Sequence, residues 1–217
     1  MTWDPFGTLA QTLWIGGGQW AGKSTVSNIL AERYGLAAYH YDYHMSRGHW
    51  DRRVAAAARA GRTLEPPTAE HMFVSSTPEE SAAEAVESLV ETFEYAIDDL
   101  RAFTSGRPIV AEGFVFRPDL VAPYLHDLRR MLLLVPTDEF REHQSRTVER
   151  AKRPSTPVSD LDLAQRNRRE RDRLVAASAV AQAGNHGIRV IHVDGTADAE
   201  GVADAVAAHF SPFLPIG

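Results

Sequence analysis

The chain has 217 residues, of which 44% are hydrophobic and 24% charged, a composition that predicts one globular domain with a sizeable core. Its formal net charge of −6 argues against general binding to nucleic acid or to an anionic membrane surface, because such binders usually carry the opposite sign. The sequence contains no cysteine, so disulfides, thiolate metal sites and cysteine nucleophiles are excluded.

The sequence also lacks the segments that direct a protein to a membrane. Residues 1–12 are not a basic segment followed by an apolar run, and no apolar stretch approaches the roughly 20 residues that span a bilayer. We therefore expect a cytoplasmic protein. The composition does not indicate an oligomeric state.

The first half of the chain alternates apolar runs with helical patterns. Residues 12–15 form a short apolar run that stops at three glycines, which predicts a buried strand followed by a turn. Residues 23–34 carry apolar side chains at helical spacing and end at a glycine, a typical C-cap residue. Residues 37–43 are rich in aromatic side chains and predict a second strand, and residues 50–62 predict a short surface helix.

The second half continues this alternation. Residues 77–80, Thr-Pro-Glu-Glu, form a capping box with proline at the first helical position and open a long amphipathic helix. Strands are predicted at 108–111, 131–135 and 189–193, and a helix follows the last of them. The unbroken apolar run at 131–135 is typical of a strand buried on both faces of a parallel sheet. We therefore predict an α/β fold with three layers, α/β/α, around a five-stranded parallel sheet.

One motif carries specific chemistry. Residues 17–24, G-G-Q-W-A-G-K-S, match the phosphate-binding loop (P-loop) pattern G-x-x-x-x-G-K-[ST] in full, between a strand and a helix as the pattern requires. Main-chain N–H groups of such a loop face the phosphates, and the following helix adds its positive N-terminal end. We predict ATP and Mg²⁺ as ligands, with Lys23 reaching the β- and γ-phosphates and the Ser24 hydroxyl ligating Mg²⁺. The predicted nucleotide-binding residues of the loop are Gly17, Gly18, Gln19, Trp20, Ala21, Gly22, Lys23, Ser24 and Thr25.

A dinucleotide-binding fingerprint is the alternative interpretation of the same segment. Residues 16–21 fit G-x-G-x-x-[GA], and Asp42 lies about where a dinucleotide fold places its ribose-binding acid. That fingerprint is weak, and it gives no role to the Lys-Ser-Thr run at 23–25. We therefore prefer the P-loop interpretation.

Four features in chain order resemble the small-molecule P-loop kinases of the nucleoside and nucleotide kinase group. This group includes shikimate kinase, gluconate kinase, chloramphenicol phosphotransferase and 2-phosphoglycerate kinase. The four features are the loop at 17–25, Asp42 after the second strand, the arginines of 146–153, and the turn at 193–196. Only the loop is specific by itself, and the others support the resemblance through their order.

The resemblance implies one kinase domain over residues 1–217. A substrate-binding insertion is expected near residues 44–76, and a helical, arginine-rich lid near residues 138–175. In such kinases the last turn lies against the adenine ring, so Gly195 and Thr196 are expected to contact the nucleotide.

The segment Y-H-Y-D-Y-H at 39–44 supplies candidate acceptor-site residues. If it is a strand, His40, Asp42 and His44 share one face beside the nucleotide. The resemblance suggests that Asp42 accepts the proton of the substrate hydroxyl or holds Mg²⁺ through water. The alternative is an aspartate that caps a turn. A metal site of the two histidines and Asp42 is conceivable, but we expect His40 and His44 to line the substrate pocket.

Glu112 follows the predicted strand at 108–111, where P-loop proteins commonly place an acid that orients Mg²⁺ through water. Its role as a base or as a metal-orienting group stays open at this point, and an ordinary strand-end carboxylate is the alternative. The run at 112–118 resembles 2-phosphoglycerate kinase sequences. This resemblance makes Arg117 a candidate contact for an acceptor anion.

Arginines suit the transfer of a phosphoryl group, because their charged planar forks stabilise the negative charge on its oxygens. Arg146 and Arg150 lie four residues apart, and we predict that they share one helix face with Arg153 just beyond. These three side chains are expected to close on the γ-phosphate and exclude water. Arg47 and Arg53 are expected contacts of the acceptor, although a surface helix explains them equally well.

The predicted function is therefore ATP-dependent phosphorylation of a small-molecule hydroxyl, with Lys23 and the lid arginines stabilising charge and Asp42 or Glu112 receiving the proton. One alternative is a nucleotide-hydrolysing switch, although the sequence has no guanine-specifying Asn-Lys-x-Asp motif. Another is a kinase acting on a short nucleic acid or a cell-wall precursor. The acceptor and the preference between ATP and GTP are open.

Overall fold

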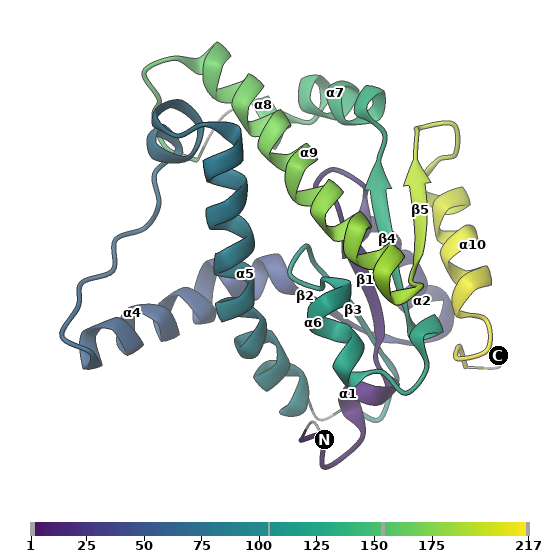
Figure 1. Cartoon of the computed structure of the whole chain (residues 1–217). Coiled ribbons are helices and arrows are strands. Elements are labelled where there is room, and N and C mark those ends of the chain that lie inside the picture. The colour runs from purple at the N-terminus through teal and green to yellow at the C-terminus, as the bar shows by residue number, and fades with distance from the viewer. Residues whose placement is uncertain (1–2, 104, 153–154, 216–217) are drawn as a thin grey trace.

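The computed structural model describes residues 3–103, 105–152 and 155–215, apart from the side chains of residues 150 and 151. Its centre is a parallel sheet with strand order β2-β3-β1-β4-β5 (Figure 1). The strands are β1 (Leu13–Gly17), β2 (Ala37–His40), β3 (Ile109–Glu112), β4 (Met131–Pro136) and β5 (Arg189–Val193). The predicted five-stranded parallel sheet is confirmed. Among the described residues, no helix combines the length and apolar character needed to cross a membrane.

Long helices cover both faces of the sheet (Figure 1). Helices α5 (Pro78–Arg101) and α9 (Leu161–His186) pack on one face, and α2 (Lys23–Tyr34) and α10 (Ala199–Phe210) pack on the other. Leu133 of β4 joins the core on the α5 and α9 side, whereas its neighbours Leu132 and Leu134 join the core beneath α2 and α10. Both faces of β4 are therefore apolar, which explains its unbroken apolar sequence.

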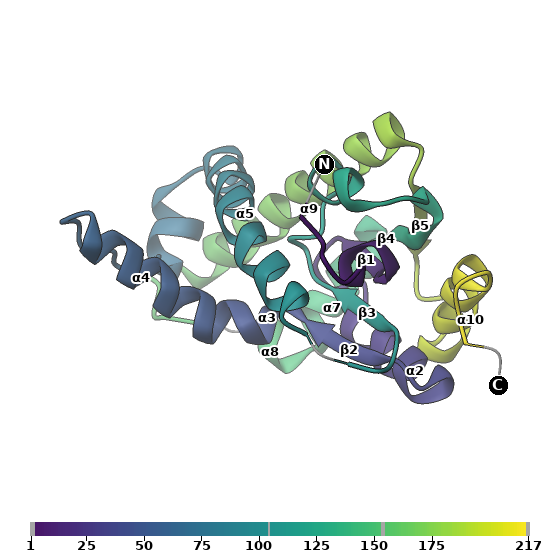
Figure 2. The same cartoon turned by 90° about the horizontal axis from the view of Figure 1, so that it is seen from below.

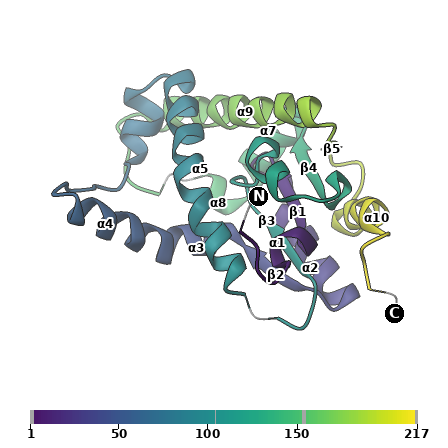
Figure 3. The same ribbon diagram turned by 60° about the horizontal axis from the view of Figure 1, so that its bottom comes forward.

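The remaining helical segments are short. They are α1 (Thr8–Gln11), α3 (Tyr41–His44), α4 (Trp50–Arg59), α6 (Pro118–Val121), α7 (Asp138–Thr147) and α8 (Glu149–Lys152), with π-helical turns at Met45–His49 and His71–Ser75 and 3₁₀ turns at Ala122–Tyr124 and Leu128–Arg130. Helix α4 projects away from the sheet in every view (Figures 2 and 3). The predicted capping box of α5 is confirmed, because the Thr77 Oγ1 accepts from the Glu80 main-chain N–H and the Glu80 carboxylate accepts from that of Thr77.

The second strand is shorter than predicted. It pairs with β3 as far as the register His40–Glu112, and β3 turns away at Gly113, so later residues of β2 would have no partner. The chain instead winds into α3, and Tyr41 packs so closely on Gly113 that an added Cβ there would lie 2.5 Å from the Tyr41 Cβ. The prediction that His40, Asp42 and His44 share one strand face is therefore wrong.

The predicted lid helix is also interrupted. Helix α7 ends at Thr147, Val148 is extended at φ −81° and ψ 120°, and α8 begins at Glu149. Both residues at the break are β-branched, and the Thr147 hydroxyl bonds to the carbonyl oxygen of His143 (2.9 Å), a contact that bends helices. Arg146 and Arg150 therefore lie on different helices, and the prediction that they share one helix face is wrong.

Candidate active site

The P-loop follows the central strand β1 and crosses the end of β4. The Gly18 N–H donates to the carbonyl oxygen of Leu134 (2.9 Å). Gly17 has φ +112°, and a Cβ on it would lie 2.1 Å from that same carbonyl oxygen. Glycine is therefore required where β1 ends, because only glycine lets the main chain turn this close to β4.

The start of α2 is suited to an anion. Gly22 has φ +78° with open space where a Cβ would stand, and the first turn of α2 contains no acidic residue. The side chain of Lys23 is folded back over the loop, where its Nζ donates to the carbonyl oxygen of Gly18 (2.7 Å). A helix N-terminus, a curled glycine loop and a lysine therefore converge in the arrangement that binds phosphates. These residues fit a nucleoside triphosphate.

Glu112 is the acidic group beside this loop, and its side chain is only 2% exposed. Burial raises the pKa of Glu112, but the hydrogen bond from His40, the charge of Lys23 and a hydrogen bond from Ser24 outweigh it and hold the pKa below its usual range. The distance from the His40 Nδ1 to the Glu112 Oε1 is 2.8 Å. The result is an ionised carboxylate next to Ser24, a donor set that fits Mg²⁺.

Three of the residues predicted to contact Mg²⁺ or the acceptor lie on α3 and the segments that follow it. Asp42 is exposed in the first turn of α3, and Arg47 is exposed in the π-helical turn. Arg53 lies in α4, where its guanidinium stands 5.6 Å from the centroid of the Trp50 ring and 3.2 Å from the Glu91 carboxylate.

Arg117 is buried rather than open to solvent, with only 3% of its surface exposed. Its Nη2 donates to the Ser178 hydroxyl of α9 (3.2 Å), and its Nε lies 3.2 Å from the Asp119 carboxylate. The Arg117 Nη1 is also buried and has no hydrogen-bond partner among the described residues. Arg117 therefore places an incompletely paired positive charge in the interior beside α9.

The turn after β5 is held by local contacts. The Thr196 main-chain N–H and hydroxyl both donate to the Asp194 Oδ1 (2.9 and 2.7 Å). Gly195 has φ +85°, and a Cβ there would lie 2.8 Å from the ring of Phe140 in α7. The turn is thereby fixed against the helix that begins the predicted lid.

Comparison with solved structures identifies the fold. The shikimate kinase from Acinetobacter baumannii, solved in complex with shikimate, matches over 94% of this chain and 95% of its own, with a TM-score of 0.50 and 15% sequence identity. The chain has the shikimate kinase fold. The Aquifex aeolicus shikimate kinase matches over 93% of this chain and 96% of its own, with a TM-score of 0.41 and 13% identity. No protein-family model and no curated protein sequence matches the chain.

Only part of the predicted lid lies within the described residues. Arg146 is 75% exposed and is held by Glu142, with 2.5 Å between the Nη2 and the carboxylate. Arg153 and the side chain of Arg150 lie outside the described residues. The predicted convergence of these arginines on a phosphate therefore stays a prediction.

Sequence reasoning missed Asn28 as a partner of His40. The Asn28 Oδ1 accepts a hydrogen bond from the His40 Nε2 (2.9 Å), while the Nδ1 of the same ring faces the Glu112 carboxylate. Position 40 is the last residue of β2 and position 112 the last of β3, so the strand order would have revealed this pair. The Asp99 carboxylate of α5, which accepts hydrogen bonds from Tyr39 and Arg52 beside β2, had no local sequence signal either.

Trp20 connects the P-loop to α9. Its main chain has φ +69°, an unusual value for a residue with a side chain, and its Nε1–H donates to the buried Asp172 Oδ2 (3.1 Å). The Arg168 guanidinium stacks on the indole ring at 5.1 Å from its centroid. These two contacts couple the P-loop to α9, so a movement of α9 would displace Trp20.

We expect Trp20→Phe to lower the free energy of unfolding by about 1–3 kcal/mol, because a buried Asp172 oxygen loses its donor while the ring that stacks with Arg168 remains. Trp3→Phe is the matched control, since Trp3 is 67% exposed, and should change stability by less than about 0.5 kcal/mol. Urea denaturation of the two variants checks this, and equal losses would show that the Trp20–Asp172 contact contributes nothing.

Proposed function

We propose that the chain is an ATP-dependent kinase that transfers the γ-phosphoryl group to a hydroxyl of a small molecule. The observation that carries this proposal is the convergence of the P-loop, Lys23 and the ionised Glu112 at the ends of the central strands. The shikimate kinase fold supports it, since parallel sheets of this kind bind ligands at the carboxyl ends of their strands.

In this proposal the loop amides and Lys23 bind the triphosphate and stabilise the charge that spreads over the transferred group. Mg²⁺, held by Ser24 with Glu112 or Asp42 beside it, would neutralise the β- and γ-phosphates. Glu112 is the better of the two acids for this task, because its carboxylate is ionised and in contact with Ser24. A carboxyl whose pKa lies below its usual range is a poor proton acceptor, so Glu112 is disfavoured as the base.

The other predicted contacts complete the proposed site. Gly195 and Thr196 would lie against the adenine, and Arg146, Arg150 and Arg153 would close on the γ-phosphate and exclude water, which competes as an acceptor. His40 orients Glu112, while Arg47, Arg53 and Arg117 supply positive charge for an anionic or polyhydroxylated acceptor. The open Arg146–Glu142 pair would have to exchange for an Arg–phosphate contact on closure.

The test is a screen of sugar acids, nucleosides, antibiotics and phosphorylated metabolites for acceptor-dependent ADP release. We expect at least one class to raise ADP release well above hydrolysis by water, with a phosphorylated product detected by mass spectrometry. Turnover that responds to no acceptor but to a protein partner would instead identify a nucleotide-dependent switch.

The chain offers an internal control for nucleotide binding, because Lys23 and Lys152 are its only lysines. Bound Mg²⁺·ATP should protect Lys23 from acylation, whereas Lys152, exposed and paired with Glu149, should react at the same rate with and without nucleotide. Peptide mass spectrometry measures both sites in one sample. Equal labelling of Lys23 in the presence and absence of ATP would contradict the proposal before any acceptor is known.

A further inference from the structure

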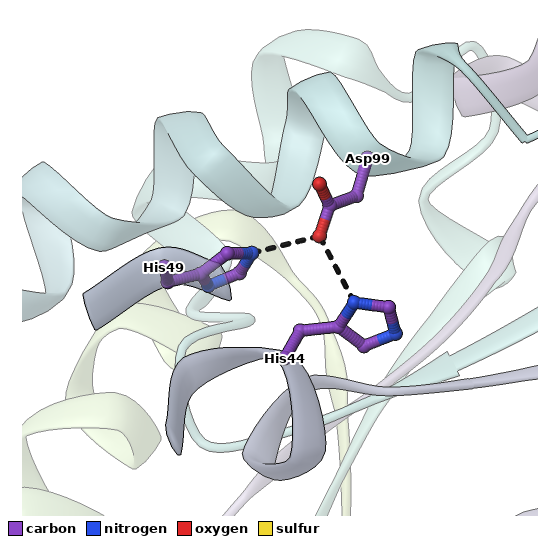
Figure 4. A group of neighbouring side chains, drawn as sticks. All are labelled: His44, His49 and Asp99. Carbon is purple, nitrogen blue, oxygen red and sulfur yellow. Dashed lines mark hydrogen bonds and ion pairs between the residues drawn. The ribbon is translucent and has the colours of Figure 1, made fainter. Parts of the chain in front are cut away.

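Three side chains that can bind a metal ion meet between α3, the π-helical turn after it and α5. They are His44 of α3, His49 of the π-helical turn and Asp99 of α5, which point toward one another (Figure 4). Their ligand atoms, the His44 Nδ1, the His49 Nε2 and an oxygen of Asp99, lie within 4.8 Å of one another. In the part of the chain that the structure describes, this is the one such group of histidine and acidic side chains.

The π-helical turn Met45–His49 brings the two histidines to the same side of the chain. In a regular α-helix, residues five positions apart point about 140° away from one another. In a π-helical turn the hydrogen bonds run from residue i to residue i+5, so His44 and His49 lie close to one turn apart and both face α5. Their ring centroids are 6.0 Å apart. Such turns are rare and occur frequently at functional sites, so this departure from a regular helix between two potential ligands indicates a site.

The distances in the group are close to those that a zinc ion requires. The Asp99 Oδ2 is 2.7 Å from the His49 Nε2 and 3.2 Å from the His44 Nδ1. Zn²⁺ binds imidazole nitrogen and carboxylate oxygen at about 2.0–2.2 Å, so the ligand atoms of a tetrahedral site lie roughly 3.4 Å apart. The His49–Asp99 contact would therefore have to open by less than about 1 Å. Two imidazoles and one carboxylate are also a ligand set that proteins use for divalent transition metals.

The Asp99 carboxylate is oriented by two further donors. Its Oδ1 accepts from the Arg52 Nη2 (2.7 Å), and its Oδ2 accepts from the Tyr39 hydroxyl (3.0 Å). A carboxylate oxygen offers about two acceptor sites, yet three partners, Tyr39 and the two histidines, face Oδ2. A metal ion between the imidazoles and Oδ2 would use one of these sites and leave the other for Tyr39. Tyr39 and Arg52 would then orient the metal-bound carboxylate through hydrogen bonds, as is usual for ligating carboxylates.

Two features of the group act against a cation. The Arg52 guanidinium is positive, but its side chain is half exposed, so solvent weakens its repulsion of an ion. The His49 Nδ1 is buried and has no hydrogen-bond partner among the described residues, so its hydrogen would stay unpaired when a metal binds Nε2. Without a metal the same nitrogen is equally unpaired, so this cost changes little on binding.

We propose that His44, His49 and Asp99 bind one divalent transition-metal ion of the Zn²⁺ class, with water in the fourth position. The exposed side chain of His44 gives the ion its path from solvent, whereas His49 and most of Asp99 are buried. The ion would fasten the start of the predicted acceptor insertion, residues 44–76, to α5, a long helix of the core. This site differs in ligands and in metal from the Mg²⁺ site of the proposed function, and the inference does not depend on that function.

The binding test uses metal-depleted full-length protein without an affinity tag, with Zn²⁺ as the probe and a chromophoric chelator as the competitor. In millimolar Mg²⁺, which prefers oxygen ligands, the wild type should still take up one Zn²⁺ per chain. His44→Gln and Asp99→Asn should each weaken this binding by about 100-fold or more, since losing an outer-shell partner alone typically costs about 10–100-fold. His71→Gln is the matched control, because His71 also faces a carboxylate, that of Glu84 (3.4 Å), but belongs to no group of three ligands among the described residues. It should keep the wild-type affinity.

The pair His40–Glu112 beside the P-loop is the other place where Zn²⁺ could bind. If Mg²⁺ displaces the ion, or if His40→Gln removes it while His44→Gln keeps it, the ion binds beside the P-loop and the inference is overturned. Equal Zn²⁺ affinities of the wild type and His44→Gln would overturn it as well.

Hydrogen exchange measures whether the ion joins the π-helical turn to α5. Zn²⁺ should slow exchange of the main-chain amides of residues 45–50 in the wild type and in His71→Gln, but not in His44→Gln. His44 is exposed, so His44→Gln should keep the wild-type urea midpoint in the absence of Zn²⁺, which shows that its fold is intact. Unchanged exchange in the wild type would contradict the inference even if Zn²⁺ binds. Neither measurement involves ATP or an acceptor, so both remain decisive if the proposed kinase function fails.

Discussion

Lys23→Ala is expected to lower kcat for phosphoryl transfer by about 10³-fold, since loss of one preorganised donor to transition-state charge costs about 10²–10³-fold and lysine adds a full charge. The Lys23 Nζ rests on the Gly18 carbonyl oxygen in the structure, so it already lies within the loop where the phosphates would bind. ADP release and product formation measure the loss. Isothermal titration of Mg²⁺·ATP separates a defect in binding from a defect in transfer.

The fold should survive this substitution. The Lys23 side chain is 8% exposed and bonds within its own loop, so we expect urea denaturation to show a loss below about 2 kcal/mol. Lys152→Ala is the matched control: it removes an exposed ion pair with Glu149, worth at most about 1 kcal/mol, and should leave kcat unchanged. A folded Lys23→Ala protein with wild-type turnover would refute the proposed mechanism.

Sequence reasoning succeeded where the signal is local. The glycine pattern and Lys23 lie within eight consecutive residues, the α5 capping box lies within four, and β4 is one unbroken apolar run. These features need no knowledge of distant residues.

The misplaced features depend on contacts made elsewhere in the chain. The second strand ends at His40 because its partner β3 turns away after Glu112, and the aromatic residues that follow are equally compatible with a strand. The Trp20–Asp172 bond joins positions 152 residues apart, so the loop tryptophan could not be assigned a partner from its neighbours. In the sequence, Asp99 is one of many charged residues on a long amphipathic helix. Only the fold shows that it lies beside His44 and His49.

Gly17→Ala should be the most destabilising small substitution in the loop. The main chain there has φ +112°, which costs an L-residue about 1–3 kcal/mol, and the new Cβ would lie 2.1 Å from the Leu134 carbonyl oxygen. Main-chain atoms of a central strand cannot step aside as a flexible side chain can, so overpacking adds about 1–3 kcal/mol. We expect a total loss of about 3–5 kcal/mol, a large share of the ~5–15 kcal/mol that stabilises a typical domain.

Gly35→Ala separates main-chain strain from this close approach. Gly35 ends α2 at φ +64° with nothing within 4 Å of its added Cβ, so only strain of about 1–2 kcal/mol applies. Urea denaturation of both variants should give the larger loss at Gly17, together with loss of Mg²⁺·ATP binding there alone. Equal losses would mean that the P-loop can shift away from β4 to accommodate the new Cβ. The close contact between Gly17 and Leu134 would then not be what holds the P-loop in place.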